Sequence, residues 1–326
     1  MIPSFVNNLL QVNSTVFNEA ALELFSFQYS NNSVYGGFVD ALARTTQSVK
    51  AIETIPFLPI SFFKTHAVKT TVFEPEQVFE SSGTTQTVQS KHLVKSLQLY
   101  EDSFFHGFTL QYGAVKDYCI LGLLPSYLER KHSSLVYMVQ RMMDESAHPL
   151  NGFFLADVDE LVKRLQQLEQ QQQKTLLIGV TFGLLDFAEK YHLPLQHTLV
   201  METGGMKGRR EEMTREEVHQ QLKKSFSVAK IHSEYGMTEL LSQAYSKGDG
   251  IFYCPPWMKV LVREEDDPMQ IRTTGKGALN IIDLANVYSC GFIATDDIGE
   301  VFEDGSFRVM GRMDNSDIRG CSLLAL

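Results

Sequence analysis

The feature that most constrains this chain is a regular alternation of strand-length apolar runs with amphipathic helical stretches between residues 117 and 226. The apolar runs include "DYCILGLL", "NGFFLAD", "TLLIGVTF" and "HTLVMET". Segments with apolar residues at helical spacing follow them, over residues 133–144, 158–172, 184–191 and 215–226. Strands joined through helices run in the same direction, so this alternation predicts an α/β fold with a mostly parallel, helix-flanked sheet.

The two ends of the chain have a different character. Residues 16–29 and 34–44 carry apolar side chains at helical spacing and predict a helical cap. After about residue 250, "MKVLVRE", "ALNIID", "GFIATD" and the hairpin-like "GEVFEDGSFRVMG" predict a β-rich subdomain. We therefore expect a helical cap and α/β core over residues 1–250, and a β-rich subdomain with a terminal tail over residues 251–326.

A glutamine-rich segment lies inside one of the expected helices. The run "QQLEQQQQK" has the composition of a low-complexity linker, but Leu161, Leu165 and Leu168 continue a single apolar stripe. The spacing favours a helix with one solvated face.

Composition excludes several classes of function. A net charge of -10 argues against nucleic acid or an anionic membrane as the main partner, although a small anionic substrate needs only a local positive patch. The first positively charged side chain is Arg44, and the longest apolar stretch, "TLLIGVTFGLLDF", is shorter than a bilayer span. We expect no secretory signal, no transmembrane helix and a cytoplasmic protein. The four cysteines show no C-x-x-C spacing and are expected to be free thiols.

One short stretch gathers hydroxyls and backbone amides. "FESSGTTQTVQSKH" at residues 79–92 contains Ser81, Ser82, Gly83, Thr84 and Thr85, after an expected strand and before a helix expected near Lys91. In a strand-loop-helix context such a loop surrounds phosphate oxygens, although it is not the G-x-x-x-x-G-K-[ST] loop. An ordinary polar turn explains the same residues equally well.

Three later segments favour the phosphate interpretation. They are "HSEYGMTELLSQAY", expected where a strand turns into a helix, "FIATDDIGEV", with paired aspartates at a strand end, and "RVMGRMDNSDIRG" after a hairpin. With the hydroxyl-rich loop, and in this order, they resemble the motifs of the adenylate-forming superfamily, which includes acyl-CoA ligases, luciferases and peptide-synthetase adenylation domains.

A closer resemblance covers nearly the whole chain. "LPSYLERKHSSLVYMV", "METGGMKGRREEM", "SEYGMTELLSQAY" and "DIRGCSLLAL" are similar to the acyl-protein synthetase of the bacterial bioluminescence fatty-acid reductase complex. That family is itself similar to phenylacetate-CoA ligases. The resemblance implies an ATP-dependent enzyme that converts a carboxylate to an acyl-adenylate and passes the acyl group to a thiol, and it makes residues 1–250 an adenylation core.

The resemblance also implies roles for individual residues. The loop from Ser81 to Thr85 would hold the β- and γ-phosphates, Thr238 would hydrogen-bond the α-phosphate, and Glu239 would ligate Mg²⁺, which prefers hard oxygen ligands. The expected nucleotide-binding residues beyond the loop are Gly204 and Gly205 for adenine through their backbone, Tyr235 stacking on the base beside Gly236, Asp297 and Arg312 for the ribose, and Asp314 at a hinge. Taken singly, Glu239 is also compatible with a first-turn helix acid, Asp297 with a turn former and Arg312 with a surface cation.

Several positions depart from the family pattern. Gln86 follows Thr85 where glycine, proline and lysine are usual, and Asp296 stands where glycine is usual, beside Asp297. The chain ends twelve residues after Asp314, so the usual C-terminal domain with its catalytic lysine is expected to be absent. A cation of "KGRR", Lys207, Arg209 or Arg210, is one candidate substitute, and a solvated basic cluster explains these residues as well.

Cys321 is the expected acyl acceptor. It follows Gly320 close to the carboxyl terminus, where the acyl-protein synthetases carry their acceptor cysteine, and a thiolate is a good nucleophile toward an activated acyl group. The alternative is a small apolar residue that docks the tail. His92, His106 and His232 fall near the motifs in sequence, but a packed histidine is commoner than a catalytic one, so no role is assigned to them.

The sequence thus predicts an AMP-forming, ATP- and Mg²⁺-dependent acyl-protein synthetase. Its substrate would be a fatty or aryl carboxylic acid, and its partner an acyl-CoA or fatty-acyl reductase. The alternatives are a carboxylate-CoA ligase of the phenylacetate type and a non-catalytic acyl- or nucleotide-binding protein.

Overall fold

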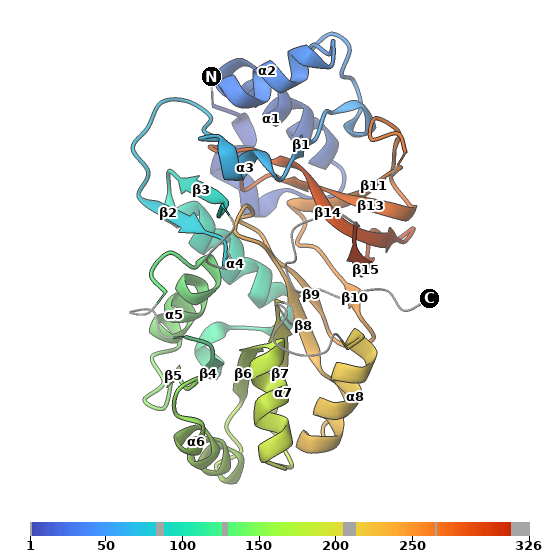
Figure 1. Ribbon diagram of the computed structural model, residues 1–326. Coiled ribbons are helices and arrows are strands. Elements are labelled where there is room, and N and C mark those ends of the chain that lie inside the picture. The colour runs from blue at the N-terminus through green and yellow to red at the C-terminus, as the bar shows by residue number, and fades with distance from the viewer. Residues whose placement is uncertain (1, 83–87, 126–129, 205–212, 265, 314–326) are drawn as a thin grey trace. The chain divides into compact units, whose positions relative to one another are not determined.

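The structure is a computed structural model that describes residues 2–82, 88–125, 130–204, 213–264 and 266–313 (Figure 1). Its described residues divide into two compact units. The first unit comprises residues 2–107, 237–243 and 253–313, and the second comprises residues 108–236 and 244–252. The division expected from the sequence near residue 250 stays a prediction.

A mostly parallel sheet forms the centre of the second unit. The strand order is β5-β4-β6-β7-β8-β9; the pairs from β5 to β8 are parallel and β9 is antiparallel to β8. The strands are β4 (Cys119–Leu123), β5 (Gly152–Phe153), β6 (Thr175–Val180), β7 (Thr198–Thr203), β8 (His232–Tyr235) and β9 (Ala244–Ser246). The helices between them are α5 (Ser134–Ser146), α6 (Val158–Gln170), α7 (Thr181–Lys190) and α8 (Arg215–Phe226). The predicted α/β class is confirmed.

Helices cover both faces of this sheet. Cys119, Leu121 and Leu123 point from β4 into one apolar cluster that also contains the buried leucines and phenylalanines of α6, α7 and α8. Gly122 points to the opposite face, where its missing side chain leaves room for Phe153 and for Met143 of α5. The alternation of side chains along one strand therefore separates the helices into two layers.

Helix α6 carries the glutamine-rich run. Leu161, Leu165 and Leu168 are fully buried, whereas the glutamines between and after them face solvent or are half-buried. Asp157 caps the helix, since its Oδ1 accepts the N–H of Glu160 at 3.1 Å. The interpretation of this segment as a helix with one solvated face is confirmed.

An antiparallel sheet lies in the first unit, in the order β15-β14-β13-β11-β12. Its strands are β11 (Met258–Arg263), β12 (Ile271–Arg272), β13 (Gly275–Asp283), β14 (Phe292–Val301) and β15 (Phe307–Arg312). The hairpin between β14 and β15 turns at Asp304 and Gly305, and Gly305 has the positive φ of 81° that this turn requires. The expected β-rich character of the C-terminal residues is confirmed.

The N-terminal segments join this antiparallel sheet. The strand β1 (Leu58–Pro59) pairs in parallel with β14, and Gln28 of α1 donates to the carbonyl oxygens of Asn286 and Val287 at 2.9 Å. The helices of this part are α1 (Phe17–Asn31), α2 (Ser33–Ala41) and α3 (Phe62–Thr65), with short 3₁₀ turns at η1 (Ser4–Gln11) and η2 (Ile52–Thr54). The predicted N-terminal helices are present within a few residues of their expected bounds.

The segment around the hydroxyl-rich loop differs from the expectation. Residues Lys91–Val94 form a strand, β3, that pairs antiparallel with β2 (Gln77–Glu80), and α4 (Leu97–Tyr112) begins only afterwards. The prediction of a strand-loop-helix is therefore wrong: the loop connects the two strands of a hairpin. The remaining elements are η3 (Val115–Asp117) and β10 (Ile251–Phe252).

Candidate active site

The Tyr235–Glu239 motif begins at the end of a strand. Strand β8 ends at Tyr235, and the following residues form a turn in which the N–H of Leu240 donates to the carbonyl of Met237 at 3.1 Å. The prediction that a helix follows is wrong. Glu239, 1% exposed, consequently lies in a buried turn, and its interpretation as a first-turn helix acid no longer applies.

Three buried side chains hold the backbone of this turn. The Oδ2 of Asp283 accepts the N–H groups of Leu241 and Ser242 at 2.8 and 3.1 Å. The Nδ2 of Asn286 donates to the carbonyl of Glu239 at 2.8 Å, and the Nδ1 of His92 contacts the carbonyl of Thr238 at 2.8 Å. Sequence patterns did not point to Asp283 or Asn286, because neither lies in a motif.

The two expected ribose residues meet in the antiparallel sheet. Asp297 on β14 is paired in register with Arg312 on β15, and the Nε of Arg312 donates to Oδ1 of Asp297 at 3.0 Å. Both side chains are largely buried, which makes the ion pair less screened than a surface pair. Asp296 is half-buried, and its carbonyl accepts the N–H of Met313. The aspartates lie within β14 and not at a strand end as expected.

The base of the hydroxyl-rich loop is closed by Ser81. Its N–H donates to the carbonyl of Ser90 at 3.0 Å, and its Oγ accepts the N–H of Ser90 at 2.9 Å. Ser81 is buried and Ser82 is exposed. The other loop residues, Gly83, Thr84 and Thr85, lie outside the described residues.

The second unit carries the expected adenine residues. Gly204 follows β7 with a φ of 70°, and its carbonyl accepts the Thr181 hydroxyl at 2.8 Å. Tyr235 is largely buried, and its ring packs against Phe252 with centroids 5.8 Å apart. Gly236 is exposed directly after β8.

Two buried carboxylates stand at the ends of β7 and β8. Burial acts to raise the pKa of Glu202, but contacts with His219 and Arg215 hold it below the ordinary value, so Glu202 is ionised. Burial raises the pKa of Glu234 to about 7, helped by the charge of Glu202 and opposed by a hydrogen bond from Thr203. Glu234 therefore changes its charge near neutral pH.

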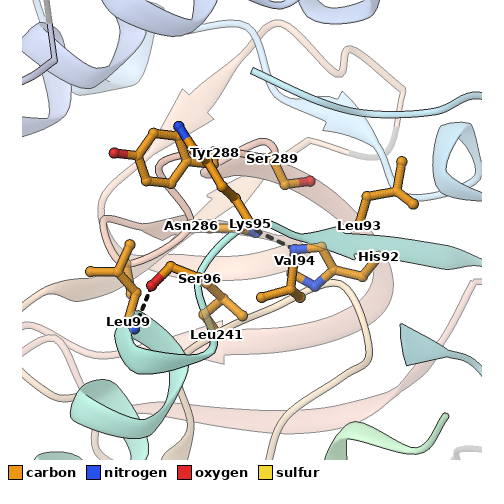
Figure 2. Close-up of a pocket in the computed structure, with 11 residues that line it drawn as sticks. His92, Leu93, Val94, Lys95, Ser96, Leu99, Leu241, Asn286, Tyr288 and Ser289 are labelled. Carbon is orange, nitrogen blue, oxygen red and sulfur yellow. Dashed lines mark hydrogen bonds between the residues drawn. The ribbon is translucent and has the colours of Figure 1, made fainter. Parts of the chain in front are cut away.

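A small pocket lies beside the turn in the first unit (Figure 2). Its lining includes His92, Lys95, Leu99, Asn286 and Tyr288. The ammonium group of Lys95 lies 4.0 Å from the centre of the Tyr288 ring, a cation-π contact that keeps this lysine at the pocket.

The chain belongs in fold to the adenylate-forming enzymes. It is similar to ATP-bound MatB from Rhodopseudomonas palustris, with a TM-score of 0.54 and 16% identity over 74% of this chain and 50% of that chain. Apo MatB from the same organism gives a TM-score of 0.52 and 17% identity over 72% of this chain and 47% of that chain. The chain thus spans about half the length of these solved structures.

The particular family follows from the sequence as a whole. A family model described as "Acyl-protein synthetase, LuxE" matches residues 9–325, so the chain belongs to this family. The resemblance identified from the motifs is confirmed. No curated protein matches the sequence.

The remaining expectations concern the metal site, the absence of a transmembrane helix, and residues outside the described part of the chain. Within the described ranges no group of three or more His, Cys, Asp or Glu side chains could hold a metal ion, and no helix there is long and apolar enough to cross a membrane. The donor set still suits Mg²⁺, which is commonly held by one or two carboxylates together with substrate phosphates, and Glu239 offers one buried carboxylate. Gly205, Lys207, Arg209, Arg210, Asp314 and Cys321 lie outside the described residues.

Proposed function

We propose that this protein is an ATP-dependent acyl-protein synthetase that activates a fatty or other apolar carboxylic acid as acyl-AMP. The acyl group then passes to Cys321 and is delivered to a reductase partner. The observation that carries the proposal is the family match over residues 9–325, a range that includes every assigned site residue and Cys321. The expectation of a cytoplasmic protein stays a prediction.

The chemistry divides into two transfers. A carboxylate oxygen attacks the α-phosphorus of ATP, the bond to the bridging oxygen breaks, and pyrophosphate leaves. The thiolate of Cys321 then attacks the carbonyl carbon of the acyl-adenylate, and AMP leaves as the thioester forms. Both steps need charge stabilisation at phosphate oxygens and correct positioning, and neither needs a strong base because the acid is already ionised.

In this proposal the nucleotide is held by the residues of the family motifs. Ser81, Ser82, Gly83, Thr84 and Thr85 bind the β- and γ-phosphates, Thr238 binds the α-phosphate, and Glu239 ligates Mg²⁺. Gly204, Gly205, Tyr235 and Gly236 form the adenine site, and Asp297 with Arg312 binds the ribose. The buried Asp297–Arg312 pair supports the last assignment, because an oriented carboxylate can accept hydrogen bonds from ribose hydroxyls.

The test is the intact mass of the protein after incubation with ATP, Mg²⁺ and a mixture of fatty and aryl acids. We expect a mass increase of one acyl group that hydroxylamine removes and that the Cys321→Ser variant lacks. Cys254→Ser is the matched control, since Cys254 is a free, half-buried cysteine with no role in the proposed reaction, and this variant should keep the adduct.

The rival functions give different results in the same experiment. AMP formation that depends on added CoA, without any adduct, would identify a carboxylate-CoA ligase of the phenylacetate type. Neither adduct nor AMP, with any acid, would indicate a non-catalytic acyl- or nucleotide-binding protein.

A further inference from the structure

We infer that His92 is a positioning residue of the adenylation site, which holds the Thr238–Glu239 turn in place through the carbonyl of Thr238 and through Asn286. This inference rests on the proposed function for its catalytic consequence. The contacts that carry it all lie within the first unit.

His92 joins two parts of the chain that the proposed reaction uses. It lies on β3, directly across from Phe79 on β2, and β2 and β3 are the strands that flank the hydroxyl-rich loop. Its ring is 1% exposed and stands edge-on to Phe63, with the ring centres 6.0 Å apart. From this position its Nδ1 contacts the carbonyl of Thr238. Its Nε2 lies 3.1 Å from Oδ1 of Asn286 (Figure 2).

The orientation of the Asn286 amide follows from its other contacts. Its Nδ2 lies 2.8 Å from the carbonyl oxygen of Glu239 and 2.9 Å from that of Cys290. Carbonyl oxygens only accept hydrogen bonds, so the NH₂ group must face them and Oδ1 must face His92. Both ring nitrogens of His92 therefore face acceptors.

A neutral imidazole has a single N–H and satisfies only one of these acceptors. Burial lowers the pKa of His92 to about 4 although both contacts act to raise it, so the ring is neutral at neutral pH. Nδ1 makes the shorter contact, and a proton on this nitrogen donates to the carbonyl of Thr238. The second contact then brings a nitrogen lone pair against Oδ1 of Asn286, which costs stability.

This unfavourable contact lies beside the turn that carries Thr238 and Glu239. Two adjacent carbonyls of the turn receive donors from His92 and Asn286, while Asp283 accepts the N–H groups of Leu241 and Ser242. The turn thereby keeps a fixed backbone without belonging to a helix or a strand. A displacement of about 1 Å in such a position lowers the rate of a reaction by up to about 100-fold.

The test compares four variants in acid-dependent exchange of pyrophosphate with ATP. His92→Phe keeps a ring but has no donor. His92→Asn places an amide nitrogen near the position of Nδ1, and His92→Gln places one near Nε2. Tyr35→Phe is the control, because it removes a hydrogen bond from a fully buried ring to the carbonyl of Pro56, and neither residue has a role in the proposed reaction.

We expect His92→Phe to lower kcat about 10- to 100-fold while the KM for ATP changes less than about threefold, since the turn acts on the transition state. The kcat of His92→Asn should lie within about threefold of the parent protein, whereas the kcat of His92→Gln should be as low as that of His92→Phe. Tyr35→Phe should remain within about twofold of the parent. A merely structural histidine would not separate Asn from Gln in this way.

The inference is overturned if folded His92→Phe exchanges within twofold of the parent protein, or if Asn rescues no better than Gln. An inactive parent protein would instead contradict the proposed function, and amide hydrogen exchange then decides the inference. Faster exchange at residues 238–242 in His92→Phe, but not in Tyr35→Phe, supports the positioning of the turn. Unchanged exchange there overturns it.

Discussion

At the scale of single residues, the pair formed by Asp297 and Arg312 shows how pairing between neighbouring strands orients a carboxylate. The two residues belong to different motifs, 15 positions apart in the sequence, and lie directly opposite each other in the β14–β15 ladder. The Nε of Arg312 donates a charge-assisted hydrogen bond to Oδ1 of Asp297 and thereby orients this carboxylate.

We predict that Asp297→Ala raises the KM for ATP about 10- to 100-fold, because charge-assisted hydrogen bonds contribute about 1.5–3 kcal/mol. The measurement is the ATP dependence of pyrophosphate exchange. Glu303→Ala, at an exposed carboxylate in the β14–β15 hairpin, is the control and should leave the KM unchanged. A folded Asp297→Ala protein with the parent KM would remove Asp297 from the ribose site.

At the scale of elements, α6 shows that an apolar stripe outweighs a composition typical of linkers. Each buried leucine contributes about 2 kcal/mol of transfer free energy, and the glutamines have good helix propensity and remain solvated. Three leucines on one face and an aspartate N-cap account for the formation of this helix.

Leu165→Ala should lower the free energy of unfolding by about 2–5 kcal/mol, since it removes a fully buried side chain and leaves a cavity among α6, α7 and the sheet. Denaturant unfolding measures this loss. Gln166→Ala changes the exposed neighbour and should stay within about 0.5 kcal/mol of the parent. Equal effects of the two substitutions would contradict the assignment of the buried face.

At the scale of the whole molecule, contacts between distant parts of the sequence define each unit. In the first unit, β1 pairs with β14 and Gln28 binds the turn after β13. In the second, the pairing of β7 with β8 brings Glu202 and Glu234, one position out of register, close together near the carboxyl ends of the two strands. Such partners lie too far apart in sequence for local spacing to reveal them.

The unfolding free energy of the whole chain should depend on pH through the titration of Glu234. Its pKa in the folded protein, about 7, is higher than the ordinary value of 4.5, so the folded state binds this proton more tightly. The resulting stability is complete below about pH 4.5 and is lost as the pH rises through 7, by at most about 3 kcal/mol. Glu234→Gln, a neutral side chain of the same shape, should not show this loss. Unfolding curves between pH 5 and 8 should therefore show the variant gaining on the parent protein, and parallel pH profiles would contradict the assignment.

The sequence by itself determined the helices and strands whose apolar spacing matches their own period, such as α6, β6 and the β14–β15 hairpin. Its motifs also sufficed for the family and for the pairing partners Asp297 and Arg312 as site candidates. Local spacing failed at Lys91–Val94 and after Tyr235, where a helix was predicted. The backbone groups of Lys91–Val94 form hydrogen bonds with the strand Gln77–Glu80. After Tyr235, buried side chains form hydrogen bonds with the backbone of the turn.

Only the tertiary structure decided which polar side chains hold the candidate site. His92 ends the hydroxyl-rich stretch, and Asp283 and Asn286 lie outside the motifs. No pattern assigned a role to any of them, because a single histidine, aspartate or asparagine is equally common in turns, caps and cores. Their function depends on partners about 40 to 190 residues away, and a buried donor or acceptor becomes meaningful only when its partner is known. Periodicity is local and appears in the sequence, whereas hydrogen-bond partnership is a property of the folded chain.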